Sequence, residues 1–428
     1  MAGAAAPARR PTAASERRAL ARLTRWAPPG VHAVLAVLGE AGGTPFIVGG
    51  AVRDAVLGRA THDFDIATRL PPARVADLFP RVVRAGEKHG TIMVLTPDGP
   101  VEVTTFRSEG AYLDGRRPST VAFHDDLEAD LARRDFTINA MAADLGARRI
   151  VDPFGGLADL TRRVVRCVGE PAARFGEDGL RPLRAVRFAG VLAFRLDRRT
   201  RDAIPGALPT FERVSWERKR DEMTRLLAEG QGPRRSVALL ESSGLLAALA
   251  PELTGVAPAR LAGLERVPRG RPWQRFAVWA VAARLSPDQA GDILRRWRVA
   301  NDDTRAVEVW VQAIFQLPAN PPSGPDLRRW LASVGAPFAQ AASQVAAAAR
   351  GPRYRGFEAR VRAALARKPV LRVEQLAVRG GDLLAIGLDG PRVGSTLRAL
   401  LDLVLETPSR NRQDELLAFA HRLSTGEP

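Results

Sequence analysis

The chain has 428 residues, too many for one hydrophobic core, so we expect two to four domains. No apolar run reaches the roughly 18 residues that a membrane-spanning helix needs, and residues 1–20 lack the apolar segment of a secretory signal. The net charge of +17 is carried almost entirely by Arg and favours a polyanionic partner such as nucleic acid, since a GC-rich genome explains the choice of Arg over Lys but not the excess over Asp and Glu.

Cys167 is the only cysteine, which excludes a disulfide within the chain and a zinc site built from cysteines, and we expect no disulfide-linked partner. Sparse cysteine is typical of a reducing compartment, so we expect a cytoplasmic protein without a membrane partner. Residues 1–20 are rich in Ala, Arg and Pro and only loosely resemble a transit peptide, and they belong to the stretch 1–28 that precedes the first predicted helix. We expect this stretch to form a flexible N-terminal extension.

The stretch 46–68, which follows a predicted helix over 30–41, combines a glycine turn with two carboxylates. Its apolar start predicts a strand that stops at Gly49-Gly50, and a short helix with Arg53 in its first turns follows. The first backbone N–H groups of a helix are unpaired, and glycines leave them uncovered. This turn is therefore a candidate phosphate site.

The second strand of this stretch is predicted to carry Asp63 and Asp65. Side chains two residues apart on a strand point the same way, so we expect both carboxylates on one face beside the glycine turn. This arrangement suits a pair of Mg²⁺ ions and the polyphosphate of a nucleotide. Glu102 lies between valines of a later strand and fits either the solvent face of that strand or a third carboxylate at the metal site.

After this stretch the pattern indicates a small mixed sheet with a few helices, an α+β unit. Alternating apolar residues predict strands, Asp98-Gly99 predicts a hairpin turn, and paired prolines predict a helix start. The expected elements are a helix over 71–79, strands over 82–85, 91–96, 101–106 and 150–151, a long polar loop over 107–123 and a helix over 124–143. The last of these helices would carry Arg133, Arg134 and Asp135 in its middle.

Helical periodicity dominates from about residue 166 to the end of the chain. Arg181, Arg184 and Arg187 are spaced by three residues and therefore stack on one helix face. The acidic pair Glu177-Asp178 lies one turn upstream. Two interpretations stay open, an exposed face of salt bridges or a face that holds phosphate and the edge of a base.

A second charged helix is predicted over 213–227. Ser215 is a plausible N-cap for it, and we favour a structural ion pair between Glu217 and Arg218. The Gly- and Pro-bearing stretch 229–233 then marks a boundary.

The remaining chain is predicted to be helical, with four tryptophans between residues 273 and 310 that are more typical of a core than of base-stacking platforms. Pro318–Pro325 indicates a linker, and glycines at 380–382 and 387–394 indicate turns. The expected helices cover 234–248, 272–284, 286–298, 302–316, 393–406 and 411–423.

The assembled motifs resemble those of the class II tRNA nucleotidyltransferases, the CCA-adding enzymes, and their poly(A) polymerase relatives. The likeness is strong from about residue 30 to residue 227 and weaker toward the C-terminus. One motif alone would be weak support, but the motifs of the family occur here in order. They correspond to residues 49–54 with 63–65, to 133–140, to 152–156, to 177–184, and to Glu217-Arg218 with Glu222.

The resemblance implies an α+β fold in which a polymerase-beta-like nucleotidyltransferase head, with a small mixed sheet, precedes an all-α neck, body and tail. No repeat of fixed period is present. The expected parts are the extension 1–28, a catalytic head over 29–165, a nucleotide-selecting neck over 166–230, a helical body over 231–320 and a tRNA-binding tail over 321–428.

The resemblance also implies roles for individual residues. Asp63 and Asp65 would hold two Mg²⁺ ions, and Glu102 fills the position of the third acidic residue of the family. The triphosphate would contact Gly49, Gly50 and Arg53, and the ribose or a phosphate would contact Arg134 and Asp135. Asp178 and Arg181 would read the edge of the base. Arg184 and Arg187 would support the phosphates and the base-reading pair.

The implied reaction is addition of C, C and A from CTP and ATP to the 3′ end of tRNA without a template. The tRNA 3′-hydroxyl attacks the α-phosphate in line and pyrophosphate leaves. Cytosine and adenine share an exocyclic amino donor for which a carboxylate can be the acceptor, and uracil and guanine lack it at the equivalent place.

Three alternatives remain: an A-only tRNA nucleotidyltransferase, a poly(A) polymerase, and a non-catalytic RNA-binding relative, against which the intact carboxylates argue. Residues 112–118 fill the place of a flexible loop that CC-only members tend to lack, which argues against CC-only addition. The region 380–394 resembles the tail of CCA-adding enzymes of Bacillus-like bacteria, and no basic extension of the poly(A) polymerase kind follows it. His421 is the only histidine of the helical half, so we expect no phosphohydrolase domain of the His-Asp kind.

Overall fold

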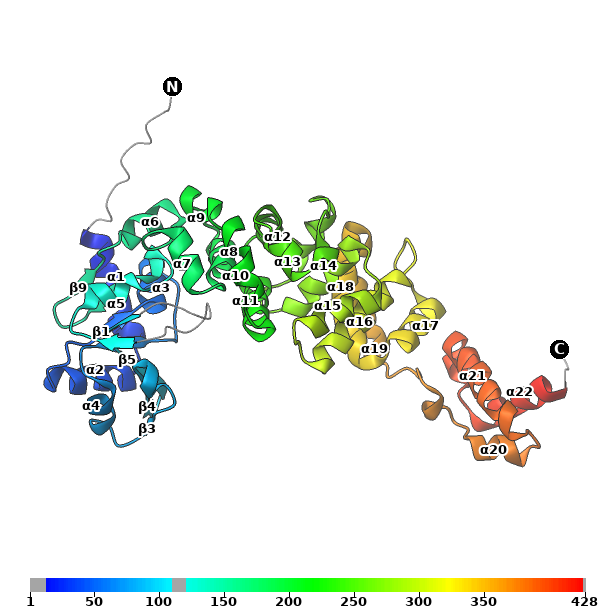
Figure 1. The fold of residues 1–428 in the computed structure, drawn as a ribbon. Coiled ribbons are helices and arrows are strands. Elements are labelled where there is room, and N and C mark those ends of the chain that lie inside the picture. The colour runs from blue at the N-terminus through cyan, green and yellow to red at the C-terminus, as the bar shows by residue number, and fades with distance from the viewer. Residues whose placement is uncertain (1–12, 110–120, 426–428) are drawn as a thin grey trace, which may run out of the picture. The chain divides into compact units, whose positions relative to one another are not determined.

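The computed structural model of the chain describes residues 13–109 and 121–425 (Figure 1). These residues form two compact units. The first contains the chain up to Leu226 together with Gly230–Leu249, and the second contains Leu227–Glu229 together with the chain from Ala250 onward. The finer division into head, neck, body and tail stays a prediction.

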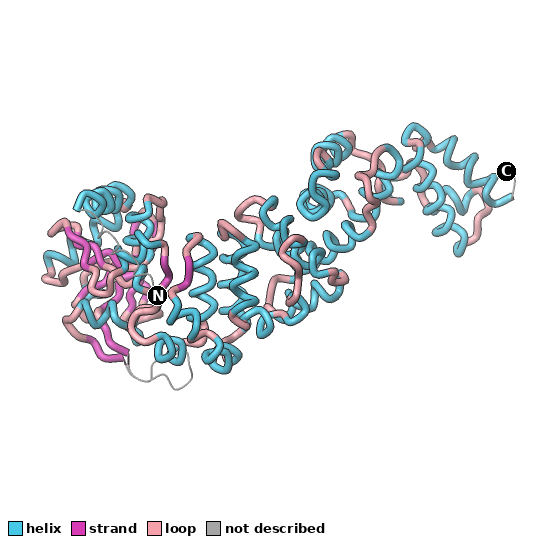
Figure 2. The backbone as a smooth tube through the Cα atoms, turned by 90° about the horizontal axis from the view of Figure 1, so that it is seen from above, coloured by secondary structure: helices cyan, strands magenta, loops and turns pink. Residues whose placement is uncertain are grey.

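The first unit is built on a seven-stranded sheet with the strand order β3-β4-β5-β2-β1-β8-β9. β2 and β5 are parallel and every other neighbouring pair is antiparallel, so the sheet is mixed, as predicted for an α+β head. Figure 2 shows the described strands gathered in this unit, in magenta. The strands are β1 (Phe46–Val48), β2 (Asp65–Thr68), β3 (Val82–Val83), β4 (Thr91–Thr96), β5 (Gly99–Thr105), β8 (Ala142–Asp144) and β9 (Arg149–Val151).

The predicted order of strand, glycine turn, helix and strand over 46–68 is confirmed. β1 is fully buried, and α3 (Gly50–Leu57) begins directly after Gly49. One detail differs, because β2 begins at Asp65 and Asp63 therefore lies in the loop that precedes the strand.

The predicted hairpin turn at Asp98-Gly99 joins β4 to β5. Asp98 Oδ2 accepts a hydrogen bond from Gly30 N over 2.7 Å at the start of α2 (Pro29–Glu40). The turn therefore satisfies one of the free N–H groups of a helix as well as closing the hairpin. The predicted helix after the prolines is α4 (Pro72–Asp77).

The expectation of a flexible extension over 1–28 is wrong for the residues that the structure describes. Residues 13–26 form a helix, α1 (Ala13–Trp26), whose Ala19, Leu20 and Leu23 are buried. Arg22 Nη1 donates to Ala55 O at the end of α3 over 2.9 Å. The apolar stripe of α1 has a surface to cover, and this packing against α3 and β9 stabilises a segment whose composition alone indicated disorder. Residues 1–12 lie outside the described part of the chain.

The predicted long helix over 124–143 is also wrong. Asp126 Oδ1 accepts from Glu128 N and caps a short helix, α5 (Leu127–Ala132), which ends before Arg133. Asp135 then binds the backbone N–H of Phe136 through its own carboxylate, a local bond that competes with helix. The small buried residues that follow form β8 beside β1, because their size suits the sheet interior.

The ends of the predicted loop over 107–123 pair with each other. β6 (Arg107–Glu109) and β7 (Val121–Phe123) form a separate antiparallel pair. The expected loop residues 112–118 lie outside the described residues. A second unexpected pair is the parallel β10 (Val164–Val165) and β11 (Arg195–Leu196), since strands were not expected beyond residue 166.

Helices form the rest of the first unit. Asp152 Oδ1 and Oδ2 accept from Gly156 N and Leu157 N over 2.7 and 2.9 Å, which caps the helix that follows the third motif. The helices are α6 (Gly156–Arg162), α7 (Pro171–Glu177), α8 (Arg181–Leu192), α9 (Arg198–Asp202), α10 (Leu208–Glu212), α11 (Trp216–Glu229), α12 (Pro233–Ser242) and α13 (Leu245–Leu249).

The described part of the second unit is helical, as predicted. Trp279 and Trp297 are fully buried, which confirms them as core residues. α18 packs against α14 and α16, so helices on both sides of the predicted linker at 318–325 belong to one unit. The helices are α14 (Pro272–Ala283), α15 (Pro287–Arg296), α16 (Asn301–Phe315), α17 (Gly324–Val334), α18 (Ala336–Arg350), α19 (Phe357–Ala366), α20 (Gly380–Ala385), α21 (Gly390–Glu406) and α22 (Gln413–Thr425).

The predicted turn at residues 380–382 is wrong, because α20 begins at Gly380. Asp382 Oδ2 accepts from Arg379 N over 2.6 Å, and this cap supports a helix start in spite of the two glycines. The predicted turn at 387–394 is confirmed only at its beginning, where Gly387 has a φ of 90°, since α21 already starts at Gly390.

Cys167 is buried, and burial raises the pKa of its thiol to about 12. Among the described residues, no helix is both long and apolar enough to cross a bilayer.

Candidate active site

A polar cavity of about 470 Å³ opens in the first unit between the sheet, α3, α8 and α11. Its lining is mostly charged, and it brings together segments that are far apart in the sequence. The lining residues are Gly49, Gly50, Arg53, Asp63, Asp65, Arg133, Arg134, Asp135, Asn139, Asp178, Arg181, Arg184, Arg187, Phe188 and Arg225. Every predicted site residue except Glu102 is among them.

The glycine turn shapes one wall of this cavity. Gly49 has a φ of 71°, in the left-handed region that favours glycine, and a Cβ atom there would lie 2.9 Å from Arg134 Nη1. Glycine therefore lets the Arg134 guanidinium approach the start of α3. Arg53 Nη1 on that helix donates to Asn139 Oδ1 over 2.7 Å, and its other nitrogens pair with Asp54.

Three carboxylates gather around the start of β2. β2 and β5 are parallel with Ile66 opposite Val103, so Asp65 and Glu102 are neighbours across the strands. Burial, then the nearby charges of Asp63 and Glu102, raise the pKa of Asp65 to about 6. Negative charges held this close repel one another, so the cluster has the electrostatics of a cation site.

The donor set can be tested against Mg²⁺. No group of three or more acidic, His or Cys side chains among the described residues is close enough to form a complete metal site. Mg²⁺ does not require one, since it is usually held by one or two carboxylates together with water and the phosphates of a substrate. Asp63 and Asp65 in the cavity fit that pattern, while Glu102 is exposed beside it.

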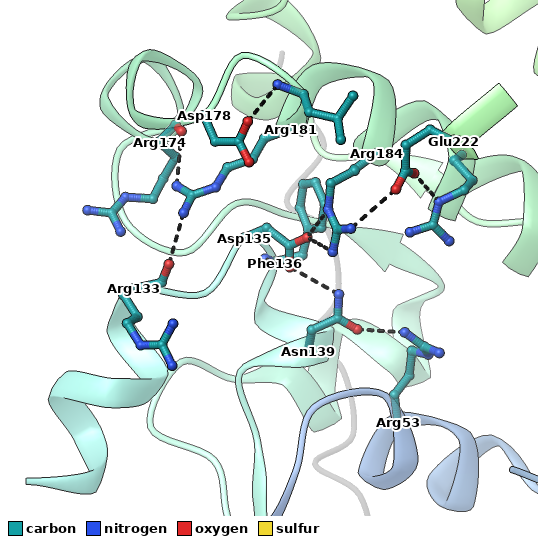
Figure 3. A network of polar contacts seen from close by, with 12 residues as sticks. Arg53, Arg133, Asp135, Phe136, Asn139, Arg174, Asp178, Arg181, Arg184 and Glu222 are labelled. Carbon is teal, nitrogen blue, oxygen red and sulfur yellow. Dashed lines mark hydrogen bonds and ion pairs between the residues drawn. The ribbon is translucent and has the colours of Figure 1, made fainter. Parts of the chain in front are cut away.

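Asp135 is the centre of a polar network, drawn in Figure 3. It accepts from Arg184 Nε over 2.8 Å and from Asn139 Nδ2 over 3.1 Å. Burial by itself would raise the pKa of Asp135, but Arg184 and the hydrogen bond from Asn139 outweigh it and lower the pKa to about 2. The carboxylate is therefore charged at neutral pH and fixes both partners in place.

The network continues to α11 through Glu222. Arg184 Nη1 donates to Glu222 Oε1 over 3.3 Å, and Arg187 Nε donates to Glu222 Oε2. Glu222 is buried, so loss of either arginine would leave a poorly paired carboxylate in the interior. Glu222 belongs to the fifth motif of the sequence, but its partners could not be read from spacing.

The other two residues of the predicted base-reading set are engaged as well. Asp178 Oδ2 accepts from Arg218 Nη2 over 2.7 Å. Arg181 is buried, and its guanidinium donates to Glu177 Oε2 over 2.5 Å and to the backbone carbonyls of Arg174 and Arg133 over 3.0 Å each.

The predicted Glu217–Arg218 ion pair is wrong, since Arg218 binds Asp178, 40 residues earlier. Ser215 stands at the N-cap of α11 but makes no capping hydrogen bond through its side chain. The two interpretations of the arginine face therefore both hold in part. The arginines are ion-paired, yet they are largely buried and face a cavity rather than open solvent.

Sequence reasoning missed four lining residues: Arg133, Asn139, Phe188 and Arg225. The first two belong to the second motif and could have been found from their place beside Arg134 and Asp135. Arg225 follows Glu222 by three residues on α11, so helical spacing places it on the same face. It is the one arginine of the lining without a partner among the described residues.

Three family models match the chain. They are the Poly A polymerase head domain over residues 45–166, the probable RNA and SrmB-binding site of polymerase A over 193–256, and the putative domain 2 of tRNA nucleotidyltransferase over 273–420. The CCA-adding enzyme of Lactiplantibacillus plantarum is 35% identical over 91% of this chain and 95% of its own length. That of Geobacillus stearothermophilus is 36% identical over 90% and 95%.

Solved structures match over nearly the whole chain. The Bacillus stearothermophilus CCA-adding enzyme in complex with CTP superposes with a TM-score of 0.78 and 32% identity, covering 94% of this chain and 99% of that one. The Thermotoga maritima CCA-adding enzyme complexed with tRNA has a TM-score of 0.65 and 20% identity, covering 95% and 98%. The second likeness supports the fold alone.

Proposed function

The chain belongs to the family of CCA-adding enzymes, and we propose that it adds C, C and A from CTP and ATP to the 3′ end of tRNA without a template. The observation that carries the proposal is the cavity of the first unit, where a glycine turn, two carboxylates and a set of arginines meet. The relative solved with CTP has this fold over 94% of the chain.

Asp63 and Asp65 would hold Mg²⁺ in this proposal, with Glu102 beside them. The chemistry that bound ions would supply there is a lower pKa of the attacking 3′-hydroxyl and stabilisation of the charge on the leaving pyrophosphate. The raised pKa of Asp65 supports the assignment, because neighbouring carboxylates that repel one another gain most from a cation.

The triphosphate would lie against the glycine turn. Gly49, Gly50 and Arg53 line the cavity at the start of α3, where the first N–H groups of the helix would bind the phosphates. Arg134 lines the cavity with its guanidinium beside this turn, where it can donate to an acceptor of the substrate. Asp135 would meet the ribose through the oxygens that Arg184 and Asn139 orient.

The base would be selected by Asp178 and Arg181 on the far side of the cavity. A carboxylate can accept from the amino group that cytosine and adenine share. A base without that donor would leave the carboxylate imperfectly paired, and such unpaired groups are the strongest source of discrimination. Arg181 is held rigidly by its three acceptors, so we assign it the role of orienting Asp178 and the base rather than of exchanging partners.

The alternative activities within the family differ in substrate. An A-only enzyme would use ATP on tRNA that already ends in CC, and a poly(A) polymerase would extend RNA that is not tRNA. The chain would act in the cytoplasm, where tRNA is matured in bacteria, without a disulfide-linked or membrane partner.

The experiment that tests the substrate class compares two RNAs of equal length. A tRNA transcript without its CCA end and an unstructured RNA are each incubated with CTP, ATP and Mg²⁺. We expect extension of the tRNA by three nucleotides and little extension of the other RNA. A long A tail on the unstructured RNA would instead identify a poly(A) polymerase.

A further inference from the structure

The aromatic ring of Phe188 is surrounded by guanidinium groups at the cavity wall. The Cζ atoms of Arg187, Arg53 and Arg184 lie 3.9, 5.1 and 5.6 Å from the ring centroid. The ring lines the cavity and is only 5% exposed. The ring also meets Phe136 edge to face, with the two centroids 5.6 Å apart.

The same three arginines are linked by a chain of polar contacts. Arg53 reaches Arg184 through Asn139 and Asp135, and Arg184 reaches Arg187 through Glu222. This chain connects α3, the segment after α5, α8 and α11. Its two ends and its middle all lie within cation–π distance of one ring.

Such an arrangement has a cost that the ring reduces. Three guanidinium groups near one another repel, although each is paired with a carboxylate: Arg53 with Asp54, Arg184 with Asp135 and Arg187 with Glu222. The negative face of an aromatic ring attracts cations from directions that no hydrogen bond uses. An aliphatic side chain of similar size would fill the space without this attraction.

We propose that Phe188 is a positioning residue that holds these three arginines in the orientation needed for nucleotide binding and selection. The inference rests on the proposed function, since it assigns these arginines to the nucleotide. Phe188 acts through them and does not itself react. Loss of the ring lets the guanidinium groups drift, so phosphate and base contacts weaken while the carboxylates that hold the metal ions stay in place.

The test compares Phe188→Leu with Phe136→Leu, a matched control. Phe136 has a buried ring that packs against Phe188, but no arginine lies over it among the described residues. Both variants lose one ring from the same cluster, so we expect similar decreases in melting temperature. Only Phe188→Leu is expected to raise the dissociation constants of CTP and ATP, by about tenfold for the loss of one or two cation–π contacts.

Two further readouts separate positioning from packing. Phe188→Leu should raise the KM for CTP more than it lowers kcat, and should increase incorporation of UTP relative to CTP. Phe188→Tyr keeps the ring face and should restore both values toward those of the wild type. Equal changes in nucleotide affinity and selection in the two leucine variants would overturn the proposal, as would a Phe188→Tyr variant as defective as Phe188→Leu.

The affinity measurement keeps this proposal separate from the proposed function. Binding of CTP and ATP to the full chain is measured by calorimetry without any RNA. A wild-type chain that binds nucleotides but does not add CCA would refute the function and leave the comparison of the variants valid. If Phe188→Leu does not fold, Phe188→Met provides the same loss of the ring with a flexible side chain, and the same two outcomes decide.

Discussion

Arg218 Nη2 donates to Asp178 Oδ2 over 2.7 Å, so the carboxylate that we assign to base recognition already has a cation partner on the neighbouring helix. Arg218 at Oδ2 and the Leu180 N–H at Oδ1, over 3.0 Å, fix the direction of that carboxylate. Each carboxylate oxygen has a second lone pair, so both contacts can persist while the carboxylate accepts from a base. Base selection in this account therefore depends on a pair of residues rather than on Asp178 alone.

The first prediction concerns this pair. Asp178→Ala and Arg218→Ala should each reduce the preference for CTP over UTP, by roughly tenfold or more, because the acceptor is lost in one and misdirected in the other. The double variant should be little worse than either single one, since both changes remove the same interaction. Relative incorporation rates in competition assays measure the effect. Preferences that are intact in Asp178→Ala, or that fall additively, would show that the pair does not read the base.

The second prediction is a pH dependence of stability at Asp135. Its folded-state pKa of about 2 lies below the ordinary value of 3.8, so the stabilisation is present above about pH 4 and is lost as pH falls toward 2. Asp135→Asn should reduce the free energy of unfolding at pH 7 by about 2–3 kcal/mol. The difference between variant and wild type, measured by urea unfolding, should shrink between pH 4 and pH 2. A difference that does not change over this range would contradict the assigned ion pair with Arg184.

The third prediction concerns the acidic cluster without divalent cations. The pKa of Asp65 is about 6 and lies above the ordinary 3.8, so its contribution to stability is present below about pH 4 and is lost as pH rises through 6. Asp65→Asn should therefore raise the melting temperature at pH 7.5 in EDTA and abolish nucleotide transfer. The corresponding gain in the free energy of unfolding has an upper limit of about 3 kcal/mol. Mg²⁺ should stabilise the wild type more than the variant. Equal stabilisation of both proteins would place the metal elsewhere.

The fourth prediction concerns Arg225, the lining arginine without a partner. A free guanidinium can bind phosphate without first breaking an ion pair, so Arg225→Ala should raise the KM of one substrate by about tenfold. A change in the KM of CTP assigns Arg225 to the triphosphate, and a change in the KM of tRNA assigns it to the RNA. Arg220→Ala is the control, because Arg220 lies on the same helix but pairs with Asp221 outside the cavity. Identical kinetics of the two variants would remove Arg225 from the site.

The sequence predicted the parts of the site that local geometry determines. Gly49-Gly50 before a helix, and two aspartates two residues apart, point to a phosphate and metal site without tertiary information. The α+β head and the helical remainder followed from periodicity. The activity was inferred from the resemblance of the motifs to a known family.

Contacts between distant residues could not be predicted in this way. Asp135 lies outside the helix in which it was expected, and its partner Arg184 lies 49 residues later. The spacing of the arginine face was visible, but Glu222, which lies 35 residues beyond Arg187, decides that the face is buried and paired. The fold of residues 13–26 depends in the same way on a surface that only the folded head provides.

The central claim is that this one cavity adds C, C and then A in order. A tRNA transcript that ends before CCA is incubated first with CTP alone and then with ATP, and the 3′ ends are sequenced after each step. The account predicts addition of two C residues from CTP alone, followed by one A after ATP is supplied. Failure to incorporate CTP, with A added to a transcript that already ends in CC, would contradict it.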